Sequence, residues 1–385
     1  LTFGKVRLAY ASVGSDIGFA EVNTALTGRQ PFSGTPAVTV GDIYRSGRIR
    51  PALSKSLEIG TELKFFNRLG VDFAYYKNNN IDQIINVDVS NASGFNQVQI
   101  NAGKIQSTGW DLTLTGDILS DRNKNWQMIF NLGSNTTKVV ELADGLNVYL
   151  YDGSGDERLE HWVGKEWGTL VGRKYKVDPK NGKNVLFASG LPDYVTNQEI
   201  GSVLPDFTGG LINNFRFKNF ELSFSIDFQK GGLFRSVTRR YLEGAGLAAE
   251  TVGVNDKGND IRMYPSLGGG VRMDGSDGNG GDRTVYIPAR NYYYTAAQRD
   301  TRNFVYDASY VKLREVRLGY NFPTSVASKL YAKNANFSVF VSNAWLIYAE
   351  SKDLGIDPSE LEASWTEGGQ LSSTRQIGAA LKLTF

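Results

Sequence analysis

The acidic side chains of the glycine-rich stretch 268–282 are the first candidates for ligand chemistry. Asp274, Asp277 and Asp282 are separated there by glycines and small polar residues. Carboxylate oxygens are the ligands that Ca²⁺ prefers in proteins. The spacing of an EF-hand and its terminal glutamate are both absent, however. We therefore expect a loop without a metal ion, and a calcium site at these three aspartates is the alternative.

Three consecutive tyrosines are the second candidates. Tyr292, Tyr293 and Tyr294 could stack on a sugar or grip a peptide, because a tyrosine ring combines a flat apolar face with a hydroxyl group. They could equally pack against a partner protein. The single histidine, His161, lies beside Trp162 and is interpreted as a loop residue. One histidine excludes a site with several histidine ligands.

The composition excludes other kinds of chemistry. Cysteine is absent, so the chain has no thiol nucleophile, disulfide or zinc ribbon. Lys and Arg total 42 and Asp and Glu total 40, which leaves no basic footprint for a nucleic acid. A glycosidase needs two carboxylates about 5–9.5 Å apart in a cleft. The acidic residues here are scattered, no such pair can be nominated, and we predict that the protein is not an enzyme.

The elements that must position these loops show a hydrophobic period of two. Between 53 and 65 the odd positions are mostly apolar and the even positions mostly polar. A tight turn at Asn67 and Arg68 follows, and the alternation then resumes. This pattern predicts a long β-hairpin. It recurs at 110–132, 211–228, 316–341 and 377–385.

Strand length and connection length favour a membrane barrel. A tilted membrane strand needs about 10 residues, whereas strands of soluble sheets are usually about 5–6 residues long. We predict roughly ten to twelve long strands. Short turns alternate with long loops near 12–50, 140–207, 231–304 and 347–374, as in outer-membrane barrels. Tyr and Phe number 19 and 21, and clusters of aromatic residues near strand ends fit an interfacial girdle.

The two ends of the sequence carry further signals. The last strand has Gly378, Leu381, Leu383 and Phe385 in an alternating pattern that ends on phenylalanine. This resembles the signal that the outer-membrane barrel assembly machinery recognises, and an open strand edge can pair by β-augmentation. Leu1 already lies inside a strand pattern, so the sequence is expected to be a piece of a longer protein.

Several motifs occur in the order found in one transporter family. The stretch 200–211 reads IGSVLPDFTGGL, 310–320 reads YVKLREVRLGY, and 357–360 reads DPSE. Together they resemble the SusC/RagA-like TonB-dependent outer-membrane transporters. The likeness extends over nearly the whole chain.

The resemblance implies an all-β fold, an antiparallel transmembrane β-barrel. Residues 1–385 would form the C-terminal part of a barrel of about 22 strands, with the plug upstream of this chain. It implies active import of an oligosaccharide or oligopeptide across the outer membrane of a Gram-negative bacterium. The partners would be a SusD-like surface lipoprotein, TonB through the missing N-terminal region, and outer-membrane lipid. The alternatives are a barrel with a binding, anchoring or secretion role, and a soluble β-rich enzyme.

Overall fold

The computed structural model describes residues 1–15, 17–18, 22–361, 363, 365–371 and 373–385. They form two compact units. Unit 1 contains Leu1–Tyr149, His161–Trp167 and Gly209–Lys218, and unit 2 contains Leu150–Glu160, Gly168–Thr208 and Asn219–Phe385. Among the described residues, no helix is both long and apolar enough to cross a membrane.

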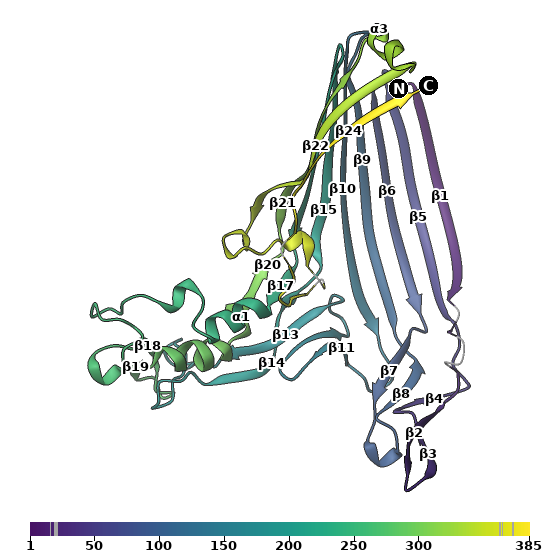
Figure 1. Cartoon of the computed structure of the whole chain (residues 1–385). Helices are drawn as coiled ribbons and strands as arrows, with labels where there is room; N and C mark the ends of the chain where they lie inside the picture. The colour runs from purple at the N-terminus through teal and green to yellow at the C-terminus, as the bar shows by residue number, and fades with distance from the viewer. Residues whose placement is uncertain (16, 19–21, 362, 364, 372) are drawn as a thin grey trace. The chain divides into compact units, whose positions relative to one another are not determined.

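Long antiparallel strands build the wall of unit 1 (Figure 1). Each strand carries the period of two, so one face of the sheet collects apolar side chains and the other polar ones. From the edge inward the strands are β1 (Phe3–Ser15), β5 (Ala52–Phe65), β6 (Leu69–Ile81), β9 (Lys104–Ser120) and β10 (Lys124–Glu141), followed by β15 (Pro205–Phe217), which belongs to unit 1 from Gly209 onward.

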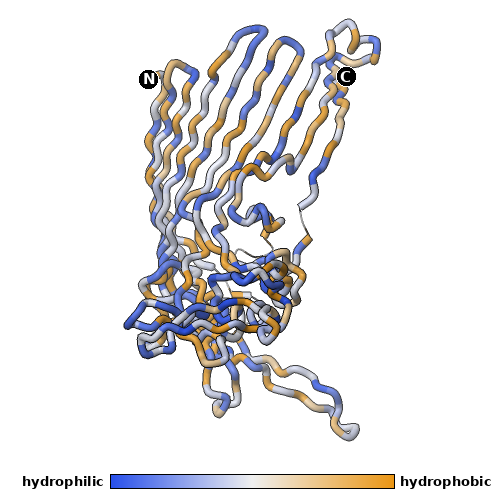
Figure 2. The backbone as a smooth tube through the Cα atoms, turned by 90° about the vertical axis from the view of Figure 1, so that its left-hand side faces the viewer, coloured by the Kyte–Doolittle hydropathy of each residue, from blue (hydrophilic) through white to orange (hydrophobic). Residues whose placement is uncertain are grey.

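The strand register makes the two faces of this wall chemically different. Leu8 lies opposite Ile59, Ile59 opposite Tyr75, and Tyr75 opposite Trp110. The Leu8 and Ile59 side chains are 70% and 52% exposed, although they are fully apolar. Figure 2 shows the same alternation of hydrophobic and hydrophilic residues along the strands. A wall with an exposed apolar face is what a lipid-facing sheet requires.

Connections at the two ends of the unit 1 wall differ in length. The β5–β6 turn is short, with Phe66 and Asn67 at φ 54° and 51°, the left-handed pair of a type I′ hairpin. At the opposite end, residues 82–103 form a long connection that is not among the four expected from the sequence. The small strands at that end are β2 (Leu26–Phe32), β3 (Thr35–Val40), β4 (Ile43–Arg45), β7 (Ile84–Asp88) and β8 (Gln97–Asn101).

Unit 2 has its own antiparallel ladder. Its strands, in order, are β16 (Phe220–Gly231), β21 (Tyr310–Asn321), β22 (Asn334–Ala349) and β24 (Gln376–Thr384). The pairing of β21 with β16 skips Arg314, which is the extra residue of a β-bulge. The bulge explains how a strand of period two can place both Arg314 and Glu315 on its polar face. The Arg314 guanidinium bonds to Asp227 at 2.8 Å, and Glu315 lies opposite Ser225.

The connections of unit 2 fold into a packed module. Phe234 and Leu170 are fully buried in two small cores of unit 2. Most elements of this module belong to unit 2. The elements of the module are β11 (Val148–Ser154), β12 (Glu157–Trp162), β13 (Thr169–Tyr175), β14 (Tyr194–Ser202), β17 (Leu233–Ser236), α1 (Val237–Gly244), β18 (Val271–Ser276), β19 (Asp282–Ile287), α2 (Ala289–Asn291), the π-helix η4 (Tyr292–Ala296), β20 (Val305–Asp307) and β23 (Thr366–Glu367). The short helix α3 (Thr324–Ala327) lies between β21 and β22.

Candidate functional site

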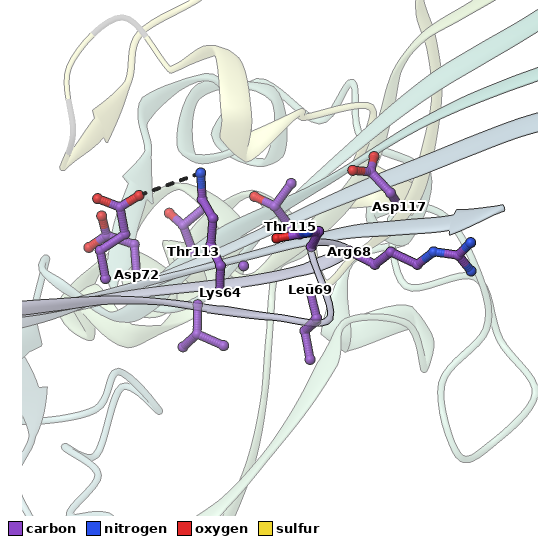
Figure 3. Close-up of a pocket in the computed structure, with 11 residues that line it drawn as sticks. Lys64, Arg68, Leu69, Asp72, Thr113, Thr115 and Asp117 are labelled. Atoms are coloured by element: carbon purple, nitrogen blue, oxygen red, sulfur yellow. Dashed lines mark ion pairs between the residues drawn. The ribbon is translucent and has the colours of Figure 1, made fainter. Parts of the chain in front are cut away.

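A polar cavity of about 430 Å³ lies on the polar face of unit 1, beside the β5–β6 turn (Figure 3). Charged and hydroxyl side chains from β5, β6 and β9 surround it. The Lys64 Nζ lies 4.0 Å from the Glu62 Oε1 and 5.7 Å from the centre of the Phe3 ring. The lining residues are Glu62, Lys64, Asn67, Arg68, Leu69, Gly70, Val71, Asp72, Thr113, Thr115 and Asp117.

Paired charges continue along the same face. The Arg7 guanidinium donates to the Asp72 carboxylate at 2.7 Å and to Glu58 at 3.4 Å. Gly60 makes room for it, because a Cβ atom there would lie 2.5 Å from the Arg7 Nε. This face is therefore polar, charged and open, which suits contact with water or another polypeptide segment better than burial of an apolar molecule.

The three aspartates of the glycine-rich stretch lie on or beside the β18–β19 hairpin, and each is engaged there. Asp274 accepts a hydrogen bond from Thr284 at 2.6 Å, which is the main reason that the pKa of Asp274 is lowered. Asp277 accepts two backbone N–H groups, and Asp282 pairs with Lys183 at 2.6 Å. The structure does not bring the three together, and no described group of three acidic or histidine side chains could hold a metal ion.

Asp178 is a residue of this region that sequence reasoning missed. Its side chain is almost fully buried and accepts hydrogen bonds from Ser276 Oγ, from the Lys180 N–H at 2.9 Å and from the Gly280 N–H at 2.8 Å. The Ser276 hydroxyl makes the largest contribution to lowering the pKa of Asp178. This carboxylate fastens the β18–β19 hairpin to the β13–β14 connection. Ser276 is 98 residues away in sequence, so no local signal points to the pair.

The three tyrosines do not form one stacking platform. Tyr292 and Tyr293 meet edge to face, with ring centroids 4.8 Å apart. Burial raises the pKa of Tyr292, and the Tyr293 hydroxyl donates to the Glu250 carbonyl oxygen. Tyr294 is the one whose side chain is largely exposed, at 62%.

Gly378, Leu381 and Leu383 of the C-terminal signal lie on strand β24, which pairs with β22, and Phe385 follows the last residue of that strand. Leu381 lies opposite Phe337 and Leu383 opposite Ala335. Gly378 lies opposite Phe340, and the Phe340 ring would be 2.5 Å from an added Cβ atom, so a larger residue here would require that ring to move. The Phe385 side chain is largely exposed.

The interpretation of His161 as a loop residue is wrong. His161 belongs to strand β12, is fully buried, and stacks on Trp167 with centroids 3.4 Å apart. The strand is only six residues long and lies within a connection, so its period was too short to recognise.

Comparison with known proteins gives consistent relatives, although no protein-family model matches the chain. "TonB-dependent receptor P3" of Formosa agariphila is 25% identical over 378 residues, covering 92% of this chain and 34% of that protein. "TonB-dependent receptor P26" of the same organism is 25% identical over 428 residues, covering 100% of this chain and 40% of that protein.

The fold is similar to that of solved transporter structures. The RagAB peptide transporter gives a TM-score of 0.73 at 20% identity, over 99% of this chain and 41% of that chain. The "open-open" state of the RagAB peptide importer gives a TM-score of 0.71 at 18% identity, over 99% of this chain and 40% of that chain. The chain thus spans about two fifths or less of these proteins.

Strand length, register and these similarities define the chain as a portion of an antiparallel transmembrane β-barrel. The chain is similar in sequence to proteins named TonB-dependent receptors and in fold to the RagAB transporter, in agreement with the family resemblance of its sequence motifs. The related proteins are named as receptors and transporters, and they imply an outer-membrane location in a Gram-negative bacterium.

Proposed function

We propose that the protein imports an oligomeric nutrient, an oligosaccharide or an oligopeptide, across the outer membrane in a TonB-dependent manner. The two-faced wall of unit 1 carries this proposal. Its exposed apolar face, with Leu8 and Ile59, suits acyl chains, and its charged face, with Arg7 and Asp72, suits a polar lumen.

A plug would lie against the polar face. The cavity beside Lys64 and Arg68 offers charges of both signs, so it suits a polar polypeptide segment. The related proteins are more than twice as long as this chain, which leaves room for a plug and for a segment that TonB contacts. In this proposal TonB displaces the plug and opens the lumen.

The connections of unit 2 would receive the nutrient together with a SusD-like surface lipoprotein. The solved structures that share the fold are of RagAB, which is named a peptide importer. The name RagAB joins two letters, A and B, and so fits an importer of two components. The exposed ring of Tyr294 and its neighbours Tyr292 and Tyr293 offer contact area to such a lid or to the cargo. Strand β24, with Gly378, and the Phe385 that follows it would be the segment recognised by the barrel assembly machinery.

Deletion of the gene tests the proposal. Cells of the deletion strain would be given labelled oligosaccharides and oligopeptides, with and without an uncoupler that collapses the proton gradient. We expect the loss of energy-dependent uptake of one class of oligomer, and restoration by the intact gene. Unchanged uptake of every oligomer would contradict import, and loss of a surface protein instead would indicate an anchoring or secretion role.

A further inference from the structure

A second cavity, of about 520 Å³, lies among the connections of unit 2. Its volume is in the range of small-molecule sites, about 300–1,000 Å³. It opens between the C-terminal end of α1, a turn at 262–264, and the segment that leads into η4. The lining residues are Glu243, Gly244, Ala245, Gly246, Thr251, Arg262, Met263, Tyr264, Pro288, Ala289, Arg290, Asn291 and Tyr293.

The frame of this cavity is held by hydrogen bonds. Arg262 donates from Nε to the Thr251 carbonyl oxygen at 2.9 Å and from Nη2 to the Gly246 carbonyl oxygen at 2.7 Å. Tyr293 belongs to a π-helix, a rare element that occurs frequently at functional sites. Arg262 is therefore a structural part of the frame, and the oxygen atoms that hold it carry no formal charge.

Two polar side chains at the cavity are available to a ligand. Arg290 and Asn291 are exposed, and neither side chain has a hydrogen-bond or ion-pair partner among the described residues. Other arginines of this region are engaged, since Arg240 pairs with Glu157 at 2.7 Å and Arg239 with Glu243 at 3.4 Å. The Glu243 carboxylate shares Arg239 with Glu250, and Arg290 adds to the cavity a positive charge that has no ion-pair partner among the described residues.

An aromatic platform lies beside these groups. The Tyr264 side chain is 71% exposed, and Met263 next to it is 40% exposed. A guanidinium group binds a carboxylate through two parallel hydrogen bonds, and an amide side chain can donate to and accept from hydroxyl groups. An exposed tyrosine ring offers a flat apolar face to a pyranose ring.

The geometry favours a sugar over an extended peptide. Peptides that add to a protein by main-chain pairing need an open strand edge. The residues that line the cavity lie in helices, turns and an irregular segment, and in the described part of the chain none of them belongs to a strand. We propose that this cavity binds a carboxylate-bearing sugar unit, of the uronic-acid type, of the oligosaccharide that the protein imports. The proposal rests on the import function and specifies its substrate class.

Binding to the natural full-length protein, extracted in detergent, tests the site. Calorimetry would compare a trisaccharide of uronic acid units, a neutral trisaccharide of the same linkage, and triglutamate. We expect the acidic trisaccharide to bind most tightly. Arg290→Ala should weaken it by about tenfold to a hundredfold, because a hydrogen bond to a charged group is lost.

Two further variants separate charge from geometry. Arg290→Lys keeps the positive charge but loses the planar fork, so it should retain only part of the affinity. Tyr264→Ala should weaken both trisaccharides. Arg122→Ala is the matched control, because Arg122 is an exposed arginine in the short β9–β10 turn of unit 1, and it should change nothing.

Three results would overturn the proposal: no binding of the acidic trisaccharide, tighter binding of triglutamate, or acidic binding that Arg290→Ala leaves unchanged. Uptake measurements keep this failure distinct from failure of the import function. If uptake is intact but binding does not depend on Arg290, only the proposed sugar site is refuted. If binding depends on Arg290 but the protein imports no oligomer, the proposed import function is refuted instead.

Discussion

The wall of unit 1 and the connection module of unit 2 are stabilised by opposite means. In the wall, backbone ladders connect neighbouring strands, while apolar side chains such as Leu8 remain exposed. In the module, strands are short, but Phe234 is fully buried and a buried carboxylate, Glu367, accepts hydrogen bonds from Ser236 and Thr238 at 2.6 and 2.5 Å. The wall therefore depends on its lipid surroundings, and the module depends on its own core and on pH.

The largest effect should come from the core of the module. Phe234→Ala removes a fully buried ring and should lower the free energy of unfolding of the module by about 3–5 kcal/mol. Limited proteolysis and thermal unfolding in detergent would measure it. Phe32→Ala, at a side chain that is 81% exposed, is the control. Equal effects of the two substitutions would show that the module has no core of its own.

The second effect tests the two faces of the wall with adjacent residues. Leu8→Arg places a charge on the apolar face near the middle of β1, which should cost about 2–4 kcal/mol in a bilayer. Ala9→Arg places the same charge on the polar face, opposite Glu58, and should cost far less. Urea titration in vesicles, followed by gel mobility of the folded barrel, would compare them. Similar losses at both positions would refute the assignment of the faces.

The third effect concerns acid. Burial acts to raise the pKa of Glu367, but hydrogen bonds from Ser236, Thr238 and the Gly369 N–H outweigh it, and the pKa lies below its ordinary 4.5. Because the folded-state pKa is the lower one, the stabilisation is present above pH 4.5 and is lost as the pH falls through the folded value. Protease sensitivity of the module should therefore rise at acid pH while the wall stays resistant.

Substitution of the same carboxyl group sharpens that test. Glu367→Gln should cost about 1–3 kcal/mol at neutral pH and flatten the acid dependence. Asp144→Asn, at an exposed carboxyl group, should leave the pH profile unchanged. If the protease sensitivity of the Glu367→Gln variant still rises at acid pH, the acid dependence belongs to another group.

The smallest effect lies on the polar face of the wall. Gly60→Ala would push the Arg7 guanidinium away from Asp72 and Glu58. These ion pairs are partly exposed, so their loss should shift the urea midpoint only slightly, and less at high salt. Gly14→Ala, where nothing lies within 4 Å, is the matched control. A large shift would mean that this face is less hydrated than its exposure indicates.

The same contrast explains what could be predicted from the sequence. The wall strands were predictable because alternation such as that around Leu57 and Ile59 is a local signal. The module was not, because its contacts join distant residues, as Glu367 and Ser236 do over 131 positions. His161 was assigned to a loop because β12 is too short to show a period. The unpaired Arg290 can be distinguished from Arg240, which pairs with Glu157, only when the spatial neighbours of both are known.

The β-bulge at Arg314 has a consequence for how strand β21 tolerates changes in length. Removing Arg314 alone leaves Lys312, Leu313, Glu315 and Val316 in continuous alternation, so the pairing with β16 stays in frame. The strand would lose the bonds that Arg314 makes to Asp227 and Glu360, and the pairing with β22, which also shifts register between Leu313 and Glu315, would have to adjust. A one-residue deletion within a membrane strand usually reverses the faces toward which the side chains of one half point, so charged side chains of that half would face lipid. At Arg314 the two halves of β21 would instead keep the same faces toward lipid and lumen, because the residue removed is the extra residue of the bulge against β16.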